Sequence, residues 1–421
     1  MGIIVQKYGG SSLADASRIH NVARRIVATA SGGDRVVAVV SAMGDTTDEL
    51  FALARSVNEQ PPPRELDMLV SAGERISMSL VAMAIDRLGR EAESFTGSQA
   101  GIITDALHGK ARIADVRPRR IVESLDKGRI PIVAGFHGVS GDTLDITTFG
   151  RGASDLTAVA LAAALEADVC ELCKDVDGVF TADPRIVPEA RKLHAVSYEE
   201  MLEMSATGSR VLMARSVELA RNHRVVLHVR SSFVQEQGTF VSEEDERMME
   251  KAIISAVTHD TSEAKVTLEG VPDQPGVAAL VFKPLAEAEV NVDMIVQNVS
   301  HEGRTDISFT VPIEDLPRAM DTMRRVTQTI GANSVDSDQE IGRVSLVGAG
   351  MRVHPGVSAD MFHALAEAGV NILMISTSPI RISCVVRKDQ VERAVQAVHD
   401  RFRLSQEVVY RAEHPPPAPA Q

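Results

Sequence analysis

The stretch "VQKYGGSSLADASRI", residues 5–19, joins a strand-like run to a helical pattern through a lysine and two adjacent glycines. Lys7, just after the expected strand, places a cation beside Gly9 and Gly10, where backbone amides can approach an anion closely. The following helix would add the positive end of its dipole. The stretch is not a P-loop, because G-x-x-x-x-G-K-[ST] is absent. It predicts a phosphate-binding loop of another kind; the alternative is a solvated loop lysine.

The composition describes an ordinary globular protein of two to four domains. The chain has 421 residues, of which 44% are hydrophobic and 24% charged,. Its formal net charge of -14 argues against general binding to nucleic acid or anionic membranes,. We find no signal peptide, no myristoylation start and no apolar run of transmembrane length, and therefore expect a cytoplasmic protein.

The paired cysteines Cys170 and Cys173 form a C-x-x-C pattern within "ADVCELCKDV", which could indicate redox or metal chemistry,. That run is typical of a buried strand. Residues three apart on a strand point to opposite faces about 10 Å apart, too far for a disulfide. We expect both to be core thiols.

The order of strand-like and helical runs divides the chain. Residues 1–245 alternate between the two, which indicates an α/β domain with a largely parallel sheet,. The charged stretch "SEEDERMMEK" begins a linker and joining strand over 246–263, and the proline-rich residues 413–421 are expected to be a disordered tail,. Between them, "PGVAALVFKPLAEAEVNVDMI" from Pro275 recurs 80 residues later as "PGVSADMFHALAEAGVNILMI" from Pro355. Each copy predicts a β-α-β-β-α-β unit.

These patterns resemble a known family. Each repeat copy looks like an ACT domain, a sensor unit found on amino-acid biosynthetic enzymes. With "KYGGSS", "SAGERIS", "TTFGRGASD" and "DVDGVFTADPR" in the family's order, residues 1–412 resemble the aspartokinases. The resemblance implies an α/β amino-acid kinase fold of three layers with a mainly parallel sheet over 1–245, followed by ACT units at 264–335 and 336–412.

The same resemblance implies a reaction. Aspartokinases transfer the γ-phosphoryl group of ATP to the β-carboxylate of L-aspartate, giving 4-phospho-L-aspartate on the route to lysine, threonine and methionine. ATP and Mg²⁺ are the implied cofactors, and no residue is assigned as a metal ligand. The nucleophile is a carboxylate with a pKa of about 4, so no general base is needed. Alignment and charge stabilisation should supply the rate.

Three residues are the expected catalytic groups: Lys7, Arg151 and Asp155, the last matching the family aspartate that organises Lys7 and the metal region. Glu74 lies in the otherwise apolar helix "LDMLVSAGERISMSLVAMAI", where a charge needs a reason,. The resemblance assigns it to the substrate's ammonium group; the alternative is a surface carboxylate paired with Arg75. Arg151 suits a bidentate grip on a carboxylate.

The expected substrate-binding residues are Thr47, Glu74, Arg151, Gly152 and Ser154. The expected ATP-binding residues are Lys7, Gly9, Gly10, Ser11, Ser41, Lys174, Asp175, Phe180, Arg185 and Arg210.

The kinase region departs from the family pattern at three positions. Ala153 replaces the second glycine of R-G-G-S-D; if this position needs a positive φ, alanine costs about 1 kcal/mol or more. Lys174 replaces a usual threonine or serine and would add a phosphate or ribose contact, or crowd the base. His137 stands where glutamine is common, and we interpret it as a pocket-wall residue.

The repeat region is expected to bind amino-acid effectors. The first unit keeps the pattern expected for threonine, whereas the second has Leu373 and Pro379 at two usual glutamate positions. Losing two acidic groups should weaken recognition of a cationic effector such as lysine, so feedback would be relaxed or altered. The expected effector-binding residues are Asp273, Gln274, Gly276, Val277, Asn291, Val292, Gln297, His354, Pro355, Asn371, Ile372 and Pro379.

An oligomer is also implied, because ACT units of this family pair between chains. Met248 and Met249 lie just before the repeat region, near where some family members start a separate regulatory subunit. The chain would form either an α2β2 assembly with an internally started ACT-only subunit or a homodimer.

Parts of the sequence also point to three other functions. "VSLVGAG", 344–350, imitates a dinucleotide fingerprint but lacks its third glycine, so a dehydrogenase is disfavoured,. Ala153 and Lys174 leave open a kinase of another amino-acid carboxylate. A non-catalytic amino-acid sensor is disfavoured because Lys7, Glu74, Arg151 and Asp155 are all present.

Overall fold

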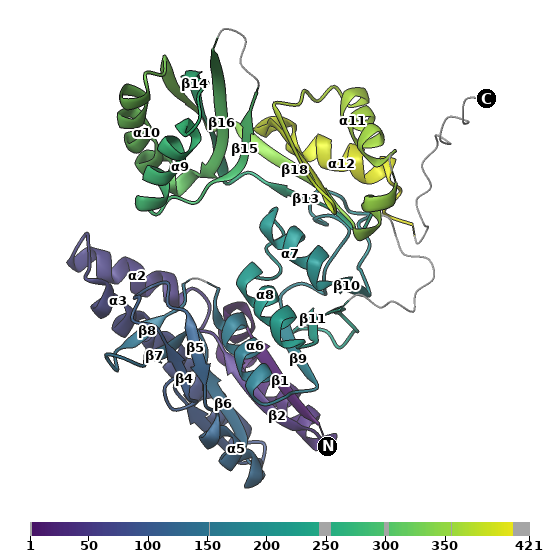
Figure 1. The fold of residues 1–421 in the computed structure, drawn as a ribbon. Helices are drawn as coiled ribbons and strands as arrows, with labels where there is room; N and C mark the ends of the chain where they lie inside the picture. Colours follow the sequence, from purple (N-terminus) through teal and green to yellow (C-terminus); the bar gives the residue numbers. More distant parts are fainter. Residues whose placement is uncertain (1, 151, 244–253, 299–302, 355, 407–421) are drawn as a thin grey trace. The chain divides into compact units, whose positions relative to one another are not determined.

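The structure is a computed structural model that describes residues 2–150, 152–243, 254–298, 303–354 and 356–406 (Figure 1). The chain divides into two compact units. The first comprises residues 1–179, 192–205 and 210–247, and the second comprises 180–191, 206–209 and 248–421. Two short segments from the N-terminal half therefore group with the repeat region. The expected linker start and the C-terminal tail lie largely outside the described residues, as do Met248 and Met249.

The first unit is built on a mainly parallel sheet, as expected. Its strand order is β10-β12-β11-β9-β1-β2-β6-β3, and among neighbouring pairs only β11–β12 is antiparallel in the described chain. The strands are β1 (Ile3–Tyr8), β2 (Arg35–Val40), β3 (Ala92–Phe95), β6 (Ile130–Ala134), β9 (Val169–Lys174), β10 (Ala195–Ser197), β11 (Leu227–Ser231) and β12 (Thr239–Ser242). A second sheet has the order β5-β4-β7-β8, from β4 (Ile102–Thr104), β5 (Ile113–Val116), β7 (His137–Ser140) and β8 (Ile146–Thr148).

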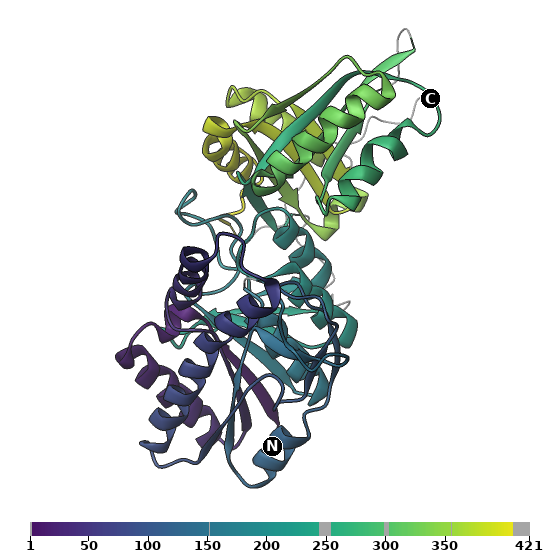
Figure 2. The same ribbon diagram turned by 90° about the vertical axis from the view of Figure 1, so that its left-hand side faces the viewer.

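Helices cover both faces of the main sheet. The helices are α1 (Ala16–Ser31), α2 (Thr46–Val57), α3 (Pro63–Val70), α4 (Ala72–Asp86), α5 (Arg119–Asp126), α6 (Ser154–Ala164), α7 (Tyr198–Ala206) and α8 (Ala214–His223), with a 3-10 turn η1 (Gly10–Leu13). Apolar residues of α1 and α4 pack with alternate residues of β1, β2 and β6 on one face. Helix α6, which is apolar all round, covers the other face and is buried along nearly its whole length,. Figure 2 shows this unit with α2 and α3 toward the viewer.

One helical stretch needs comment because it is long and apolar. Residues 63–86 have the length and mean hydropathy of a membrane span, and half of the most apolar window is buried inside the protein. The expectation that no apolar run reaches this length is therefore wrong by that measure. In the structure the stretch is two helices, α3 and α4, and Asp67 and Glu74 within it are buried.

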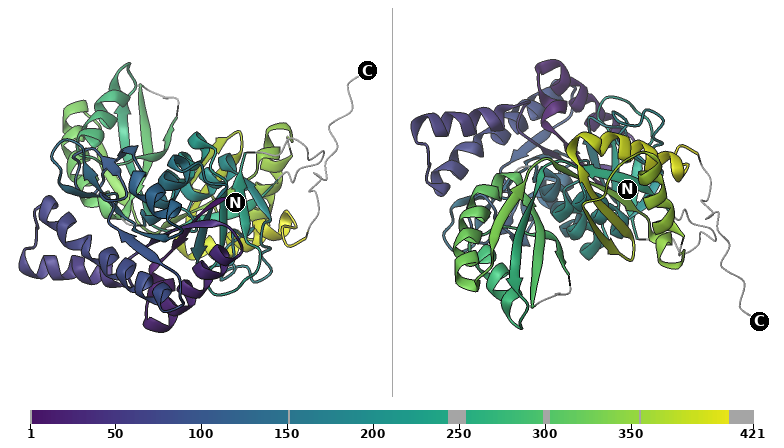
Figure 3. Two further views of the ribbon diagram at one scale, coloured as in Figure 1. Left: turned by 90° about the horizontal axis from the view of Figure 1, so that it is seen from below. Right: turned by 90° about the horizontal axis from the view of Figure 1, so that it is seen from above.

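The second unit contains two sheets, one in each repeat unit, and the helices come in the same order along both repeat units. The first repeat unit has the sheet order β15-β16-β14-β17, with α9 and α10 packed on it (Figure 3). Its elements are β14 (Glu263–Pro272), α9 (Val277–Glu287), β15 (Asp293–Gln297), β16 (Arg304–Pro312), η2 (Ile313–Asp315), α10 (Leu316–Ile330) and β17 (Ser334–Asp338). This is the expected β-α-β-β-α-β unit.

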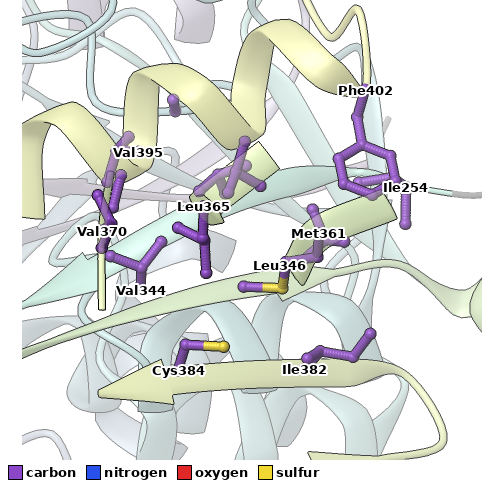
Figure 4. Packing of buried hydrophobic residues seen from close by; sticks show 14 of the residues in the cluster. Ile254, Val344, Leu346, Met361, Leu365, Val370, Ile382, Cys384, Val395 and Phe402 are labelled. Carbon is purple, nitrogen blue, oxygen red and sulfur yellow. The ribbon is translucent and has the colours of Figure 1, made fainter. Parts of the chain in front are cut away.

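The second repeat unit takes one strand from elsewhere in the chain. Its sheet order is β13-β18-β20-β19, and its edge strand β13 (Ala256–Asp260) precedes the first repeat unit. The other elements are β18 (Ile341–Val347), η3 (Ala349–Val353), α11 (Val357–Glu367), β19 (Met374–Ser378), β20 (Arg381–Arg387), η4 (Lys388–Gln390) and α12 (Val391–Arg401). Figure 4 shows its core, where Leu346, Met361 and Phe402 pack together with Ile254 from just before β13. The segment of "VSLVGAG" in β18 pairs antiparallel with β13 and β20, which excludes the parallel dinucleotide-binding arrangement,.

The three cysteines are buried and have free thiols. Cys170 and Cys173 lie on the buried strand β9, which confirms that they are core residues.

Candidate active site

The candidate site lies at the carboxyl edge of the main sheet in the first unit. Five neighbouring strands of the main sheet run parallel to one another, in the order β6, β2, β1, β9 and β11. The loops that follow these strands therefore converge at this edge,. Hydrogen bonds tie these loops together. The Ser12 and Ser232 hydroxyls lie 2.5 Å apart, and both the N–H and the hydroxyl of Ser232 donate to the Lys174 carbonyl (2.7 Å each). The loops after β1, β9 and β11 thus form one connected wall.

A buried cluster of charges occupies this edge. Lys7 lies within β1, not after it, and is only 5% exposed, so the alternative of a solvated loop lysine is wrong. Its Nζ lies 2.8 Å from Oδ1 of Asp155, which sits in the first turn of α6. The Nζ of Lys174, at the end of β9, donates to Oδ2 of the same carboxylate. The strand register explains why the two lysines meet: Lys7 lies opposite Leu172, so Lys174, two residues on, points to the same face,.

The environment shifts the pKa values of two members of this cluster. Burial by itself would raise the pKa of Asp155, but the ammonium groups of Lys174 and Lys7 outweigh it and lower that pKa to about 2,. Burial lowers the pKa of Lys174, and the nearby Lys7 charge lowers it further, against the opposing attraction of Asp155. Asp155 is therefore an ionised carboxylate at neutral pH.

The glycine loop after β1 passes close to a second loop. A Cβ on Gly10 would lie 2.8 Å from the Gly44 carbonyl oxygen and 3.0 Å from that of Ala42, closer than side chains tolerate against backbone. The Gly44 N–H donates to the Gly10 carbonyl (3.0 Å), and the Ser41 N–H donates to the Tyr8 carbonyl (3.0 Å). A Cβ on Gly9 would lie 3.5 Å from Nζ of Lys7, so this backbone runs beside the cation. Glycine is therefore needed at Gly10, whereas a Cβ on Gly9 would make only an ordinary contact,.

Glu74, in the first turn of α4, also contacts this second loop. Its Oε1 accepts a hydrogen bond from the Ala42 N–H (3.1 Å), whereas its buried Oε2 has no hydrogen-bond partner in the described structure. Glu74 is only 2% exposed, so the alternative interpretation, a surface carboxylate paired with Arg75, is wrong. Burial raises the pKa of Glu74 from 4.5 to about 7. An unpartnered buried carboxylate oxygen is costly and suits a cationic ligand.

The departure at Ala153 causes no backbone strain. Its φ is -80°, so the expected cost of alanine at a positive φ does not arise. The preceding Gly152 has a φ of +76° and is exposed, and it is the residue of this turn that needs glycine,. Ser154, buried at the start of α6, lies so close to Gly135 that a Cβ there would come within 2.8 Å of its side chain. Arg151 lies outside the described residues.

The other expected kinase residues are spread over both units. In the first unit, Ser11, Ser41 and Thr47 are half-buried near the two loops, and Asp175 and Arg210 are exposed. In the second unit, Phe180 is half-buried and the exposed Arg185 is paired with Asp183. Their nucleotide-binding roles stay predictions.

His137 is deeply buried on β7, and its Nε2 accepts a hydrogen bond from the Gly97 N–H (3.3 Å). Burial and the Arg75 charge lower the pKa of His137 to about 4, so it is neutral at physiological pH. Among the described residues, no group of three or more His, Cys, Asp or Glu side chains could hold a metal ion.

The expected effector residues lie at equivalent turns of the two repeat units. In the first, Gly276 caps α9 with a φ of +94°, Val277 begins that helix and is buried, and Gln297 ends β15 and is exposed. In the second, His354 precedes α11, its Nδ1 lying 2.8 Å from the Gly350 carbonyl oxygen, and the exposed Pro379 follows β19. The remaining described members are exposed or half-buried: Asp273 and Gln274 precede α9, Asn291 and Val292 lie between α9 and β15, and Asn371 and Ile372 lie between α11 and β19. Pro355 lies outside the described residues.

Sequence reasoning missed a buried arginine that joins the two repeat units. Arg343 on β18 is 2% exposed and contacts Asp293 of β15 and Glu263 of β14, the latter at 3.0 Å. It also donates to the Ala206 carbonyl (2.9 Å), which belongs to a segment from the N-terminal half of the chain. The only signal in the sequence was a single charge within the apolar run "IGRVSLV".

The buried cations and the glycine loop at this edge of the sheet suit an anion such as phosphate, and the comparison with known families gives the class, a kinase acting on an amino acid,. Residues 2–231 match the amino acid kinase family model, and residues 266–326 and 344–402 match an ACT domain model. The aspartokinase of Mycolicibacterium smegmatis is 58% identical over 96% of this chain and 97% of its own length. The chain belongs to the aspartokinase family.

Further relatives support the same assignment. The aspartokinase of Corynebacterium glutamicum is 57% identical over 97% of this chain and 99% of its own length. The crystal structure of E. coli aspartokinase III, solved with aspartate and ADP, superposes with a TM-score of 0.82 at 24% identity, covering 95% of this chain and 100% of that one. At that identity the likeness speaks for the fold.

Proposed function

We propose that this protein is an aspartate kinase that transfers the γ-phosphoryl group of ATP to the β-carboxylate of L-aspartate, with amino-acid feedback through its ACT domains. One observation supports this most directly. The loop from Ser41 to Gly44 is contacted both by the buried carboxylate of Glu74 and by the glycine loop that follows Lys7. An anionic group for an ammonium and a cationic group for phosphates thus border one loop.

The acceptor would be held by complementary charges. Oε2 of Glu74 is buried and lacks a partner among the described residues, and the substrate's ammonium group would satisfy it. Arg151 would hold a substrate carboxylate, and Thr47, Gly152 and Ser154 would supply neutral contacts. Because Glu74 has a pKa of about 7 in the free protein, binding of an ammonium group would draw it into the ionised form,.

The chemical step would rely on charge placement. The acceptor carboxylate is already ionised near neutral pH, so no residue has to remove a proton. Lys7 would place its ammonium on the transferring phosphoryl group, and Asp155 would orient it through the 2.8 Å ion pair,. Gly9 and Gly10 would let backbone amides approach the phosphates.

Mg²⁺ would be held mainly by the nucleotide. Both oxygens of Asp155 are engaged by lysines, and the described residues contain no metal-binding cluster. Mg²⁺ is commonly bound through substrate phosphates and water together with one or two carboxylates, and there it neutralises phosphate charge.

Hydroxylamine trapping of the acyl phosphate tests this proposal. We expect ATP-dependent hydroxamate formation that is selective for aspartate, abolished by Lys7→Ala and retained by Lys127→Ala, an exposed lysine at the end of α5. Turnover only with another amino acid would mean that the acceptor is different. ATP binding without turnover on any acceptor would favour a non-catalytic sensor.

The regulatory and cellular parts of the proposal extend the same assignment. The catalytic domain would span 1–245, the ACT domains 264–335 and 336–412, and threonine, with lysine as a further candidate, would be the effectors. We propose a cytoplasmic protein that forms a homodimer, or an α2β2 assembly with an ACT-only subunit. Sedimentation of the purified protein, with and without a co-expressed product starting at Met248, would distinguish the two assemblies.

A further inference from the structure

The cluster at the carboxyl edge of the sheet carries one more positive charge than its carboxylate can neutralise. Two ammonium groups, of Lys7 and Lys174, share the single carboxylate of Asp155, which leaves a net charge of +1. All three side chains are largely withdrawn from solvent, with exposed fractions of 7%, 17% and 1% respectively. The adjacent Asp175 is exposed and acts on Lys174 only weakly. A buried excess charge is unfavourable until a counter-ion binds.

The position of Lys174 indicates which anion would serve as that counter-ion. Both ammonium groups lie within bonding distance of one carboxylate, so they are about 8 Å apart at most. The backbone of Lys174 is fixed by Ser232, whose hydroxyl also meets Ser12 in the turn that follows Gly9 and Gly10. Lys174 is therefore built into the wall of the glycine loop. Phosphates bound by that loop and by Lys7 would lie within its reach.

We propose that Lys174 is a second phosphate-binding cation, which acts beside Lys7 and keeps Asp155 neutralised when Lys7 moves onto the transferring group. This inference rests on the proposed use of ATP as phosphoryl donor. If Lys7 were the only partner of Asp155, each contact of Lys7 with a phosphate would compete with that ion pair. With Lys174 also present, Asp155 keeps a counter-ion while Lys7 binds phosphate. The ribose and base are disfavoured as its partners, because Lys174 contacts the group that orients Lys7.

Calorimetric titration with three probes distinguishes a contact of Lys174 with phosphate from a contact with the ribose or base. Tripolyphosphate carries the phosphates alone, adenosine carries the base and ribose alone, and ATP carries both. For Lys174→Gln we expect the affinity for tripolyphosphate and ATP to fall roughly 10- to 100-fold, the usual worth of a charged hydrogen bond. Adenosine affinity should be unchanged. Lys174→Arg should restore most of the phosphate affinity, and Lys127→Gln should match the wild type.

Two results would overturn the proposal. Unchanged tripolyphosphate affinity in Lys174→Gln would make Lys174 a counter-ion of Asp155 only. An equal loss for adenosine would place it on the ribose or base. The variant should fold, because Asp155 keeps Lys7 as its partner. Failure of the proposed function would be seen separately, as a wild-type protein that binds tripolyphosphate but forms no aspartyl hydroxamate.

Discussion

Glu74 gives the sharpest prediction, because its burial couples folding to pH. Its pKa is raised from 4.5 to about 7, which corresponds to about 3 kcal/mol of folding free energy once the solution is well above pH 7,. Below pH 4.5 the side chain is neutral in both the folded and the unfolded chain and costs nothing. As pH rises through 7, the folded protein has to carry a buried charge that the unfolded chain holds in water, and stability is lost.

The substitution Glu74→Gln removes this cost. Glutamine can still accept the hydrogen bond from the Ala42 N–H, so the packing is kept. As the pH is raised from 5 to 8.5, we expect the free energy of unfolding of the variant to increase by about 2–3 kcal/mol relative to that of the wild type. Urea unfolding followed by far-UV circular dichroism measures this, since the chain has no tryptophan to report by fluorescence. Glu49→Gln, on the exposed face of α2, is the matched control and should show no such trend.

Binding of aspartate should offset this loss of stability at high pH in the wild type. An ionised Glu74 gains a partner when the ammonium group binds, so aspartate should stabilise the wild type at pH 8.5 and leave Glu74→Gln nearly unaffected. The KM for aspartate should rise as pH falls below 7, because the neutral carboxyl binds ammonium weakly. An identical stability difference at both pH values, together with a flat KM profile, would refute the assignment of Glu74 as the buried titrating group.

Three further predictions concern other parts of the molecule. Gly10→Ala should lower kcat at least tenfold and reduce urea stability by about 1–3 kcal/mol, because the added methyl meets two backbone oxygens within 3.0 Å; wild-type values would contradict that close approach,. Arg343→Met should cost about 3 kcal/mol or more by leaving the largely buried carboxylate of Glu263 without its cation and by removing the partner of the more exposed Asp293, measured as a lower thermal midpoint of the whole chain; an unchanged midpoint would argue against it,. Because Leu373 and Pro379 replace two acidic residues, lysine and threonine assayed singly and together should give weakened concerted inhibition of the kinase, and full concerted inhibition would sink this idea.

Patterns local in the chain were the ones that predicted the structure well. Alternation of strand-like and helical runs predicted the parallel sheet, and the 80-residue repeat predicted two sheets of one design. The glycine pair after the first strand predicted an approach of backbone amides to phosphates, which stays a prediction; the structure shows instead a close approach of Gly10 to the backbone of Ala42 and Gly44. Glu74 was singled out because a charge in a largely apolar helix needs a reason, and its burial agrees.

Features that depend on distant parts of the chain were not predicted. The contact between Lys174 and Asp155 arises from the register of β9 against β1 and from the packing of α6, which no local pattern encodes. The φ of Ala153 could not be inferred from the family's preference for glycine at that position. Arg343 finds its carboxylates on two strands more than forty residues away, so a single charge in an apolar run gave no hint of its partners.

The position of β13 has a consequence for how the chain is made. During translation, the edge strand of the second ACT sheet leaves the ribosome before the entire first ACT domain, while its pairing partner β18 leaves after it. The first ACT domain can therefore fold as it emerges, but β13 has to wait, unpaired, through the synthesis of about eighty residues,. A shorter product initiated at Met248 would carry this strand and could complete both sheets. A product initiated beyond Asp260 would leave the second sheet without its edge.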